Sequence, residues 1–117
     1  MNRIRTKAGR ILRDLGVPEH LKGYSCLLTA IELTVLDPML TQRMMEGLYP
    51  AVARRCRSTP PGVERAMRHA IETAWKRCDQ RMQAFYFGNT LSPRRGKPAN
   101  SEFIACVSNT LQQEESP

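Results

Sequence analysis

Apolar residues recur at intervals of three and four along most of this chain, which is the spacing of one face of an α-helix. The alternation of apolar and polar residues that marks a half-buried strand is not sustained over four positions. The pattern therefore predicts an all-α protein. The expected helices cover residues 4–15, about 20 or 23 to 36, 38–47, 50–57, 60–76 and 79–87, and a last helix begins with Asn100 as its N-cap.

The segment from Tyr24 to Gln42 contains no Lys or Arg, and its apolar residues spread beyond a single stripe. Such a segment predicts the central helix of the fold. With 117 residues, of which 41% are hydrophobic, the chain is long enough for one domain with a core and too short for two domains of ordinary size. We therefore expect a single domain over residues 1–117, with a loose tail from about residue 113.

Basic residues outnumber acidic ones by 18 to 11, and the excess is concentrated in the middle of the chain. Residues 43–81 carry a net charge of +5 and residues 82–97 one of +3, whereas residues 98–117 carry −3. This charge favours a polyanionic partner. Nucleic acid ranks ahead of a membrane surface because no basic amphipathic helix with exposed aromatics is visible. A basic protein that is merely soluble is the simpler interpretation of the charge alone.

Candidate chemistry is sparse. No apolar run approaches the roughly 18 residues that span a bilayer, and the N-terminal residues lack the apolar stretch of a signal peptide, so we expect a cytoplasmic protein. The cysteines are 30, 22 and 28 residues apart, which suits neither metal ligation nor a redox pair. Neither His20 nor His69 has a nucleophile motif nearby. The sequence predicts no metal, no cofactor and no catalytic site.

The expected helices at 50–57 and 60–76 are joined by a tight turn and form a candidate helix-turn-helix. Ala53 is small where the two helices must pack closely, and Val63 is the apolar residue that would fasten the second helix to the first. A glycine is usual in such a turn, but Arg57 stands in that place, so the pattern is only partly met.

The exposed face of the helix at 60–76 carries the side chains that could read DNA. Glu64, Arg65, Arg68 and His69 stand near its N-terminal end, which is the end that enters the major groove. An Arg can donate two hydrogen bonds to guanine, and a carboxylate can accept one from cytosine. The alternative is that Glu64 and Arg68 form an ordinary ion pair on a solvated helix.

Four stretches of this chain carry a resemblance that covers nearly all of it: GVPEHLKGY, LYPAVARR, VERAMRHAIETAW and KPANSEFIACV. They resemble the C-terminal DNA-binding domain of the stage-zero sporulation response regulator, the master transcription factor of endospore formers. The resemblance implies a compact six-helix, all-α domain whose helix-turn-helix covers about residues 50–76. It also implies a transcriptional regulator that reads a short TGTCGAA-like box in the major groove with the helix at 60–76.

Site residues follow from the resemblance position by position. Arg65 matches the residue that reads guanine, Glu64 matches the one that reads cytosine, and Arg68 lies at the base-reading surface. The residues expected at the DNA backbone are His69, Thr59, Arg94, Arg95, Lys97, Asn100 and Ser101.

The sequence also departs from the family. In the family the recognition helix usually opens with a Ser and a basic residue, whereas this chain has Pro61 and Gly62 at those positions. Two phosphate contacts are therefore expected to be missing. The basic loop at 91–96 is expected to replace some of the lost charge. The receiver domain that precedes this domain in the family has no counterpart in these 117 residues, so no phosphorylation switch is expected in them.

Three functions follow from these observations. The first is a DNA-binding regulator, with RNA polymerase (through its sigma subunit) and a second copy side by side on tandem boxes as further candidate partners. The second is an interaction protein that keeps the fold but pairs with a regulator or RNA polymerase without productive DNA binding, which Pro61 and Gly62 favour. Single-stranded RNA binding is weaker, because only seven aromatic residues are present and most lie on apolar stripes.

Overall fold

The computed structural model describes residues 2–88 and 96–115, and every regular element in them is helical. This confirms the predicted all-α fold, and no strand occurs in the described part of the chain. The α-helices are α1 (Asn2–Asp14), α2 (Lys22–Leu36), α3 (Tyr49–Cys56), α4 (Pro60–Arg77), α5 (Gln80–Phe87) and α6 (Asn100–Glu115). Two short turns, the 3₁₀ turn η1 (Pro38–Gln42) and the π-helical turn η2 (Met44–Leu48), connect α2 to α3.

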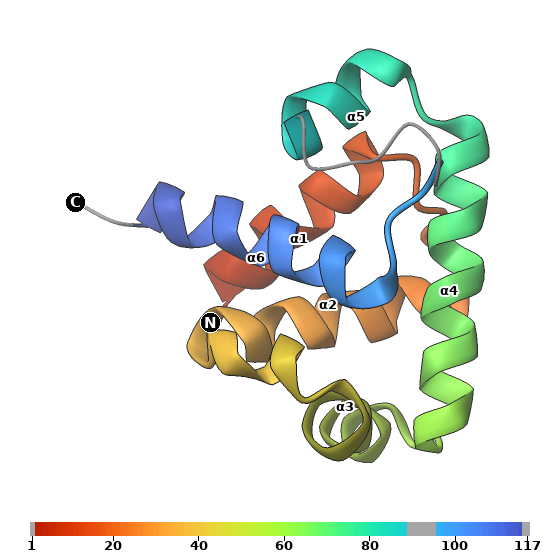
Figure 1. Ribbon diagram of the computed structural model, residues 1–117, viewed down its shortest axis with the longest axis vertical. Helices are drawn as coiled ribbons and strands as arrows, with labels where there is room; N and C mark the ends of the chain where they lie inside the picture. Colours follow the sequence, from red (N-terminus) through yellow and green to blue (C-terminus); the bar gives the residue numbers. More distant parts are fainter. Residues whose placement is uncertain (1, 89–95, 116–117) are drawn as a thin grey trace.

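The helix α2 is the centre of the fold, as predicted, and packs against α1, α3, α4 and α6. In Figure 1, α4 stands along one edge of the molecule, with α3 at its N-terminal end and α5 beyond its C-terminal end. The ends of α1 and α6 meet at the opposite edge, where Lys7 Nζ lies 2.6 Å from a carboxylate oxygen of Glu115. One surface of α4 is therefore far from both ends of the chain.

The helices α2 and α4 touch through their backbones at Gly23. A Cβ atom at that residue would lie 2.1 Å from the carbonyl oxygen of Ala66 and 2.6 Å from the Cβ atom of Ala70. Real Cβ atoms are not found so close to a backbone atom, so this crossing requires glycine. The contact fixes the N-terminal end of α2 against the middle of α4.

Most helix ends lie within two residues of the sequence-based prediction, but two segments differ more. The helix predicted at 38–47 is wrong, because the backbone at Arg43 (φ −135°, ψ 57°) is not helical and separates η1 from η2. The loose tail predicted from residue 113 is also wrong up to residue 115, since α6 continues to Glu115, whose carboxylate pairs with Arg3 and Lys7 of α1. Residues 116–117 lie outside the described part.

The thiols of Cys26 and Cys56 lie together although 30 residues separate them in the chain. Burial, together with the neighbouring Cys56 thiol, raises the pKa of Cys26 to about 11. All four cysteines are free. Within residues 2–88 and 96–115 no group of three His, Cys, Asp or Glu side chains is placed to hold a metal ion, and no helix is long and apolar enough to cross a membrane.

The helix-turn-helix is built around a left-handed residue. The helix α3 ends at Cys56, and Arg57 adopts φ 53° and ψ 53°, the conformation for which glycine is usual. The small residue Ala53 and the apolar residue Val63 are both buried between the two helices, as expected. Thr59 is the N-cap of α4, and its side-chain oxygen accepts a hydrogen bond from the backbone N–H of Gly62 at 3.1 Å.

We expect Arg57→Gly to stabilise the domain by about 0.5–1 kcal/mol, because glycine adopts positive φ without the steric cost that a Cβ atom brings. The midpoint of urea unfolding measures this. The matched control is Arg55→Gly, an exposed Arg inside α3, which should destabilise by about 1 kcal/mol. Equal losses for both variants would contradict the prediction.

Candidate nucleic-acid interface

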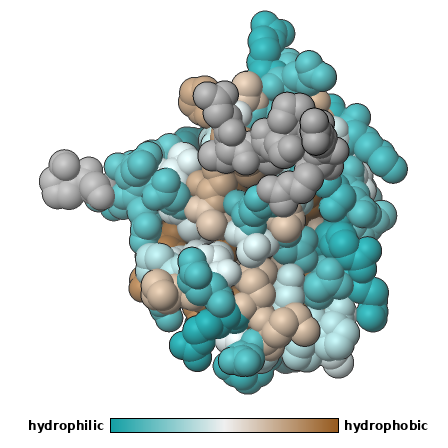
Figure 2. All heavy atoms as spheres, in the orientation of Figure 1, coloured by the Kyte–Doolittle hydropathy of each residue, from teal (hydrophilic) through white to brown (hydrophobic). Residues whose placement is uncertain are grey.

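The helix α4 has one face in the core and one face at the surface. Its buried side chains lie three and four residues apart and are Val63, Met67, Ala70, Ile71 and Ala74. Its exposed basic side chains are Arg65, Arg68, His69, Lys76 and Arg77. Figure 2 shows mainly hydrophilic side chains along the edge of the molecule that α4 occupies in Figure 1. A rigid, polar helix face of this kind can enter the major groove of DNA.

Arg65 is the predicted base-reading residue that is free to bind a ligand. Its side chain is exposed, and among the described residues it has no hydrogen-bond or ion-pair partner. It lies about one turn and a half from the N-terminal end of α4. Its guanidinium can therefore contact a base without first leaving another partner.

Glu64 and Arg68 are paired with each other. The Nε atom of Arg68 donates to one carboxylate oxygen of Glu64 at 2.9 Å, and an Nη atom donates to the other at 3.4 Å. This is the ion pair that the sequence allowed as the alternative to base reading. An exposed pair at this spacing is worth about 0.3–0.5 kcal/mol, so either side chain can exchange its partner at little cost.

Asn100 is not the N-cap of α6, which corrects the prediction. The N-cap is Ala99, whose carbonyl accepts from the N–H of Phe103 at 2.9 Å and whose own N–H donates to Glu102 at 2.8 Å. The Asn100 amide instead donates to the hydroxyl of Tyr49 at 3.0 Å and to the carbonyl of Glu64 at 3.2 Å. It therefore ties α3, α4 and α6 together rather than pointing free into solvent.

A shallow cavity of about 280 Å³ lies between the starts of α4 and α6. It brings together five residues that the sequence predicted at the DNA surface; these are Glu64, Arg68, Lys97, Asn100 and Ser101. Tyr49, a largely buried residue, also lines it, and burial raises the pKa of its hydroxyl. The cavity is open and has a mixed polar and apolar lining, which suits a flank of a recognition helix rather than a binding pocket for a small apolar ligand.

The other residues predicted to contact the DNA backbone do not form a single cluster. Lys97 is half-buried, with its Nζ atom 3.9 Å from a carboxylate oxygen of Glu72 on α4. His69 is exposed on the outer face of α4, and Thr59 is exposed just before it but uses its side-chain oxygen as the helix cap. Arg94 and Arg95 lie outside the described residues.

The sequence-based reasoning missed Lys22 and Ser58. The Nζ atom of Lys22 donates to the hydroxyl of Ser58 at 3.1 Å, and both lie next to the N-terminal end of α4. The two residues are 36 positions apart, and Lys22 belongs to α2, so no local pattern could associate them. The only sequence feature that marks this place is Gly23, the residue after Lys22. The structure shows that the contact of Gly23 with α4 brings Lys22 close to the N-terminal end of that helix.

The comparison with known families agrees with this geometry. The family model described as Sporulation initiation factor Spo0A C terminal matches residues 8–111. The match takes in all of α2 to α5, about half of α1 and most of α6, and thus both helices of the helix-turn-helix. This family is one of DNA-binding regulatory domains and not of enzymes. The chain therefore belongs to the family of C-terminal domains of the sporulation initiation factor Spo0A, the DNA-binding domains of sporulation transcription regulators.

Proposed function

We propose that this domain binds double-stranded DNA sequence-specifically and reads a short TGTCGAA-like box by placing α4 in the major groove. Arg65 carries the proposal, because it is an exposed guanidinium near the N-terminal end of a helix whose opposite face is locked in the core. It donates two hydrogen bonds to a guanine. Glu64, one residue before it, accepts from the amino group of a cytosine.

The ion pair of Glu64 with Arg68 is compatible with this role. In the protein without DNA, Arg68 holds the carboxylate of Glu64 at the surface. Because the pair contributes only a few tenths of a kcal/mol, a cytosine amino group can replace one of its hydrogen bonds, and Arg68 is then free to contact a neighbouring base or phosphate.

The N-terminal end of α4 contributes little to phosphate binding in this proposal. Pro60 and Pro61 have no N–H group. The N–H of Gly62 donates to the Thr59 side chain, and that of Val63 donates to the Thr59 carbonyl at 2.8 Å. Helix N-termini often bind phosphate through such free N–H groups, and here none of the first four is free. Phosphate contacts must then come from side chains.

The same observation favours a second candidate function, an interaction protein that keeps this fold and pairs with another regulator or with RNA polymerase. RNA polymerase, through its sigma subunit, and a second copy of the domain on tandem boxes are also the partners that we propose for the DNA-bound protein. The two functions differ in one measurable respect, which is binding to duplex DNA alone.

We expect the affinity for duplex DNA to fall with salt, with a slope of log affinity against log salt of roughly −4 to −5, because about four to six phosphates are neutralised. Fluorescence anisotropy with a box-containing duplex and a scrambled duplex, from about 50 to 300 mM salt, measures both the slope and the sequence preference. A slope near zero, or equal affinity for the two duplexes, would contradict sequence-specific DNA binding and favour the interaction protein.

A further inference from the structure

The side of α4 that faces the start of α2 carries basic groups that the proposed function has not yet used. We name this surface the α2-side flank and define it by Lys22, Ser58, His20 and Arg77. Lys22 and Ser58 lie at the N-terminal end of α4, and Arg77 is the last residue of that helix. The flank thus extends along the whole of α4, roughly 26 Å for its 18 residues.

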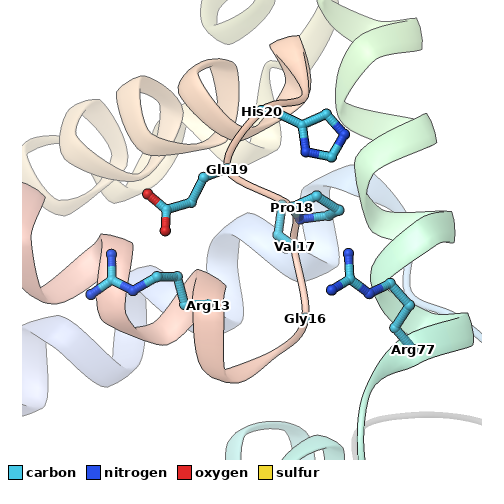
Figure 3. Close-up of a pocket in the computed structure, with 7 residues that line it drawn as sticks. All are labelled: Arg13, Gly16, Val17, Pro18, Glu19, His20 and Arg77. Carbon is cyan, nitrogen blue, oxygen red and sulfur yellow. The ribbon is translucent and has the colours of Figure 1, made fainter.

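Arg77 and His20 line the same cleft, which has a volume of about 490 Å³ and lies beside the turn between α1 and α2. Figure 3 shows Arg77 extending from α4 toward Pro18 and His20. The carboxylate of Glu19 lies on the other side of the turn, near Arg13 (Figure 3). The cleft wall next to α4 is therefore basic.

The two sides of α4 differ in how their cations are neutralised. On the side that faces α6, Arg68 pairs with Glu64 at 2.9 Å, and Lys97 lies 3.9 Å from Glu72. On the α2-side flank, Lys22 contacts only the neutral hydroxyl of Ser58.

Arg77 and His20 likewise have no hydrogen-bond or ion-pair partner in residues 2–88 and 96–115. The cations Lys22 and Arg77 on this flank are therefore available to an external anion, whereas Arg68 and Lys97 on the other side already lie beside carboxylates.

A helix in the major groove has a sugar-phosphate strand on each side, because the groove is only about 12 Å wide. When an unpaired cation of the protein binds a phosphate, the counterions condensed on the DNA there are released. A cation that is paired with a carboxylate must first break that ion pair. The N–H groups of Gly62 and Val63 at the start of α4 already donate to Thr59, so they cannot bind a phosphate in place of these side chains.

Resting on the DNA binding proposed above, we propose that the α2-side flank binds the phosphates of the strand that borders α4 on this side. Lys22 and the Ser58 hydroxyl hold one phosphate oxygen: Lys22 keeps two further N–H donors, and Ser58 accepts from Lys22 and donates its own proton. Arg77 contacts the same strand further along. The backbone contact at Gly23 holds Lys22 in place, so the phosphate site is preformed.

The test is the salt dependence of the variants Lys22→Ala, Arg77→Ala and the double variant, measured on the box and on scrambled DNA. Each single change should reduce the steepness of the slope by about 0.9 and weaken binding about eightfold at 0.1 M salt, equally on both duplexes. The double variant should lose about 1.8 in slope and roughly 60-fold in affinity.

Two further variants control the experiment. Arg3→Ala removes the same charge at the opposite edge of the molecule and should leave the slope unchanged. Lys22→Arg keeps the charge and should restore the slope, which excludes a folding defect as the cause. An unchanged slope in the double variant, or a loss confined to the matched box, would overturn the inference. If the unaltered protein binds neither duplex, the proposed function itself fails, and the two failures are thereby distinguished.

Discussion

Arg65→Ala is expected to cost about 1–3 kcal/mol of binding free energy on the matched box and almost nothing on scrambled DNA. The reason is that a bidentate contact to guanine discriminates between bases, whereas a phosphate contact does not. Arg65 is exposed and has no partner in the described part of the chain, so its removal should leave the fold intact. Anisotropy titrations with both duplexes measure the effect.

Glu64→Ala provides the matched comparison on the neighbouring residue. It should relax the preference for cytosine at one position while total affinity stays equal or rises, because a negative charge is removed from the path of a polyanion. It also frees Arg68 from its ion pair. If Arg65→Ala instead weakens the matched and scrambled duplexes by the same factor, Arg65 is only a phosphate contact, and its proposed role is wrong.

Gly23→Ala is expected to destabilise the domain by about 3 kcal/mol or more. The added Cβ atom would overlap the carbonyl oxygen of Ala66, which is backbone of α4 and cannot rotate away as a side chain does. The helices α2 and α4 must then separate, and the buried contacts on both sides of the crossing loosen. Urea unfolding followed by circular dichroism measures the loss.

Gly9→Ala is the control for that prediction, since it is also a buried glycine inside a helix. Its added Cβ atom would lie closest to the ends of two side chains rather than to a backbone atom, the Tyr24 hydroxyl at 3.0 Å and an Arg13 nitrogen at 3.3 Å. The gain in helix propensity should offset this crowding, so we expect a change within about 1 kcal/mol. A similarly small effect for Gly23→Ala would mean that the α2 and α4 crossing can adjust, and that Lys22 is not held rigidly.

Most helices could be predicted because they depend on local patterns. The stripe of α4, its Thr59 cap and the end of α3 near Arg57 are each encoded within a few neighbouring residues. The helix predicted at 38–47 was wrong because the short turns there depend on an Asp37 side chain that accepts from the N–H of Met39 and on the non-helical backbone at Arg43. The prediction that Asn100 caps α6 was wrong because Ala99 is the N-cap and its N–H donates to Glu102. The Asn100 amide instead binds residues distant in the sequence.

The sequence by itself determined the helical class, the central position of α2, the family resemblance and the face of α4 that carries Arg65, because periodicity decides which side of a helix is apolar. Only the tertiary structure decided which charges are free. Glu72 meets Lys97 across 25 positions, and Lys22 meets Ser58 across 36, while Arg65 meets no described residue. Such partners depend on how helices cross, and that geometry is set by close contacts such as Gly23 on Ala66 rather than by the order of residues within any one helix.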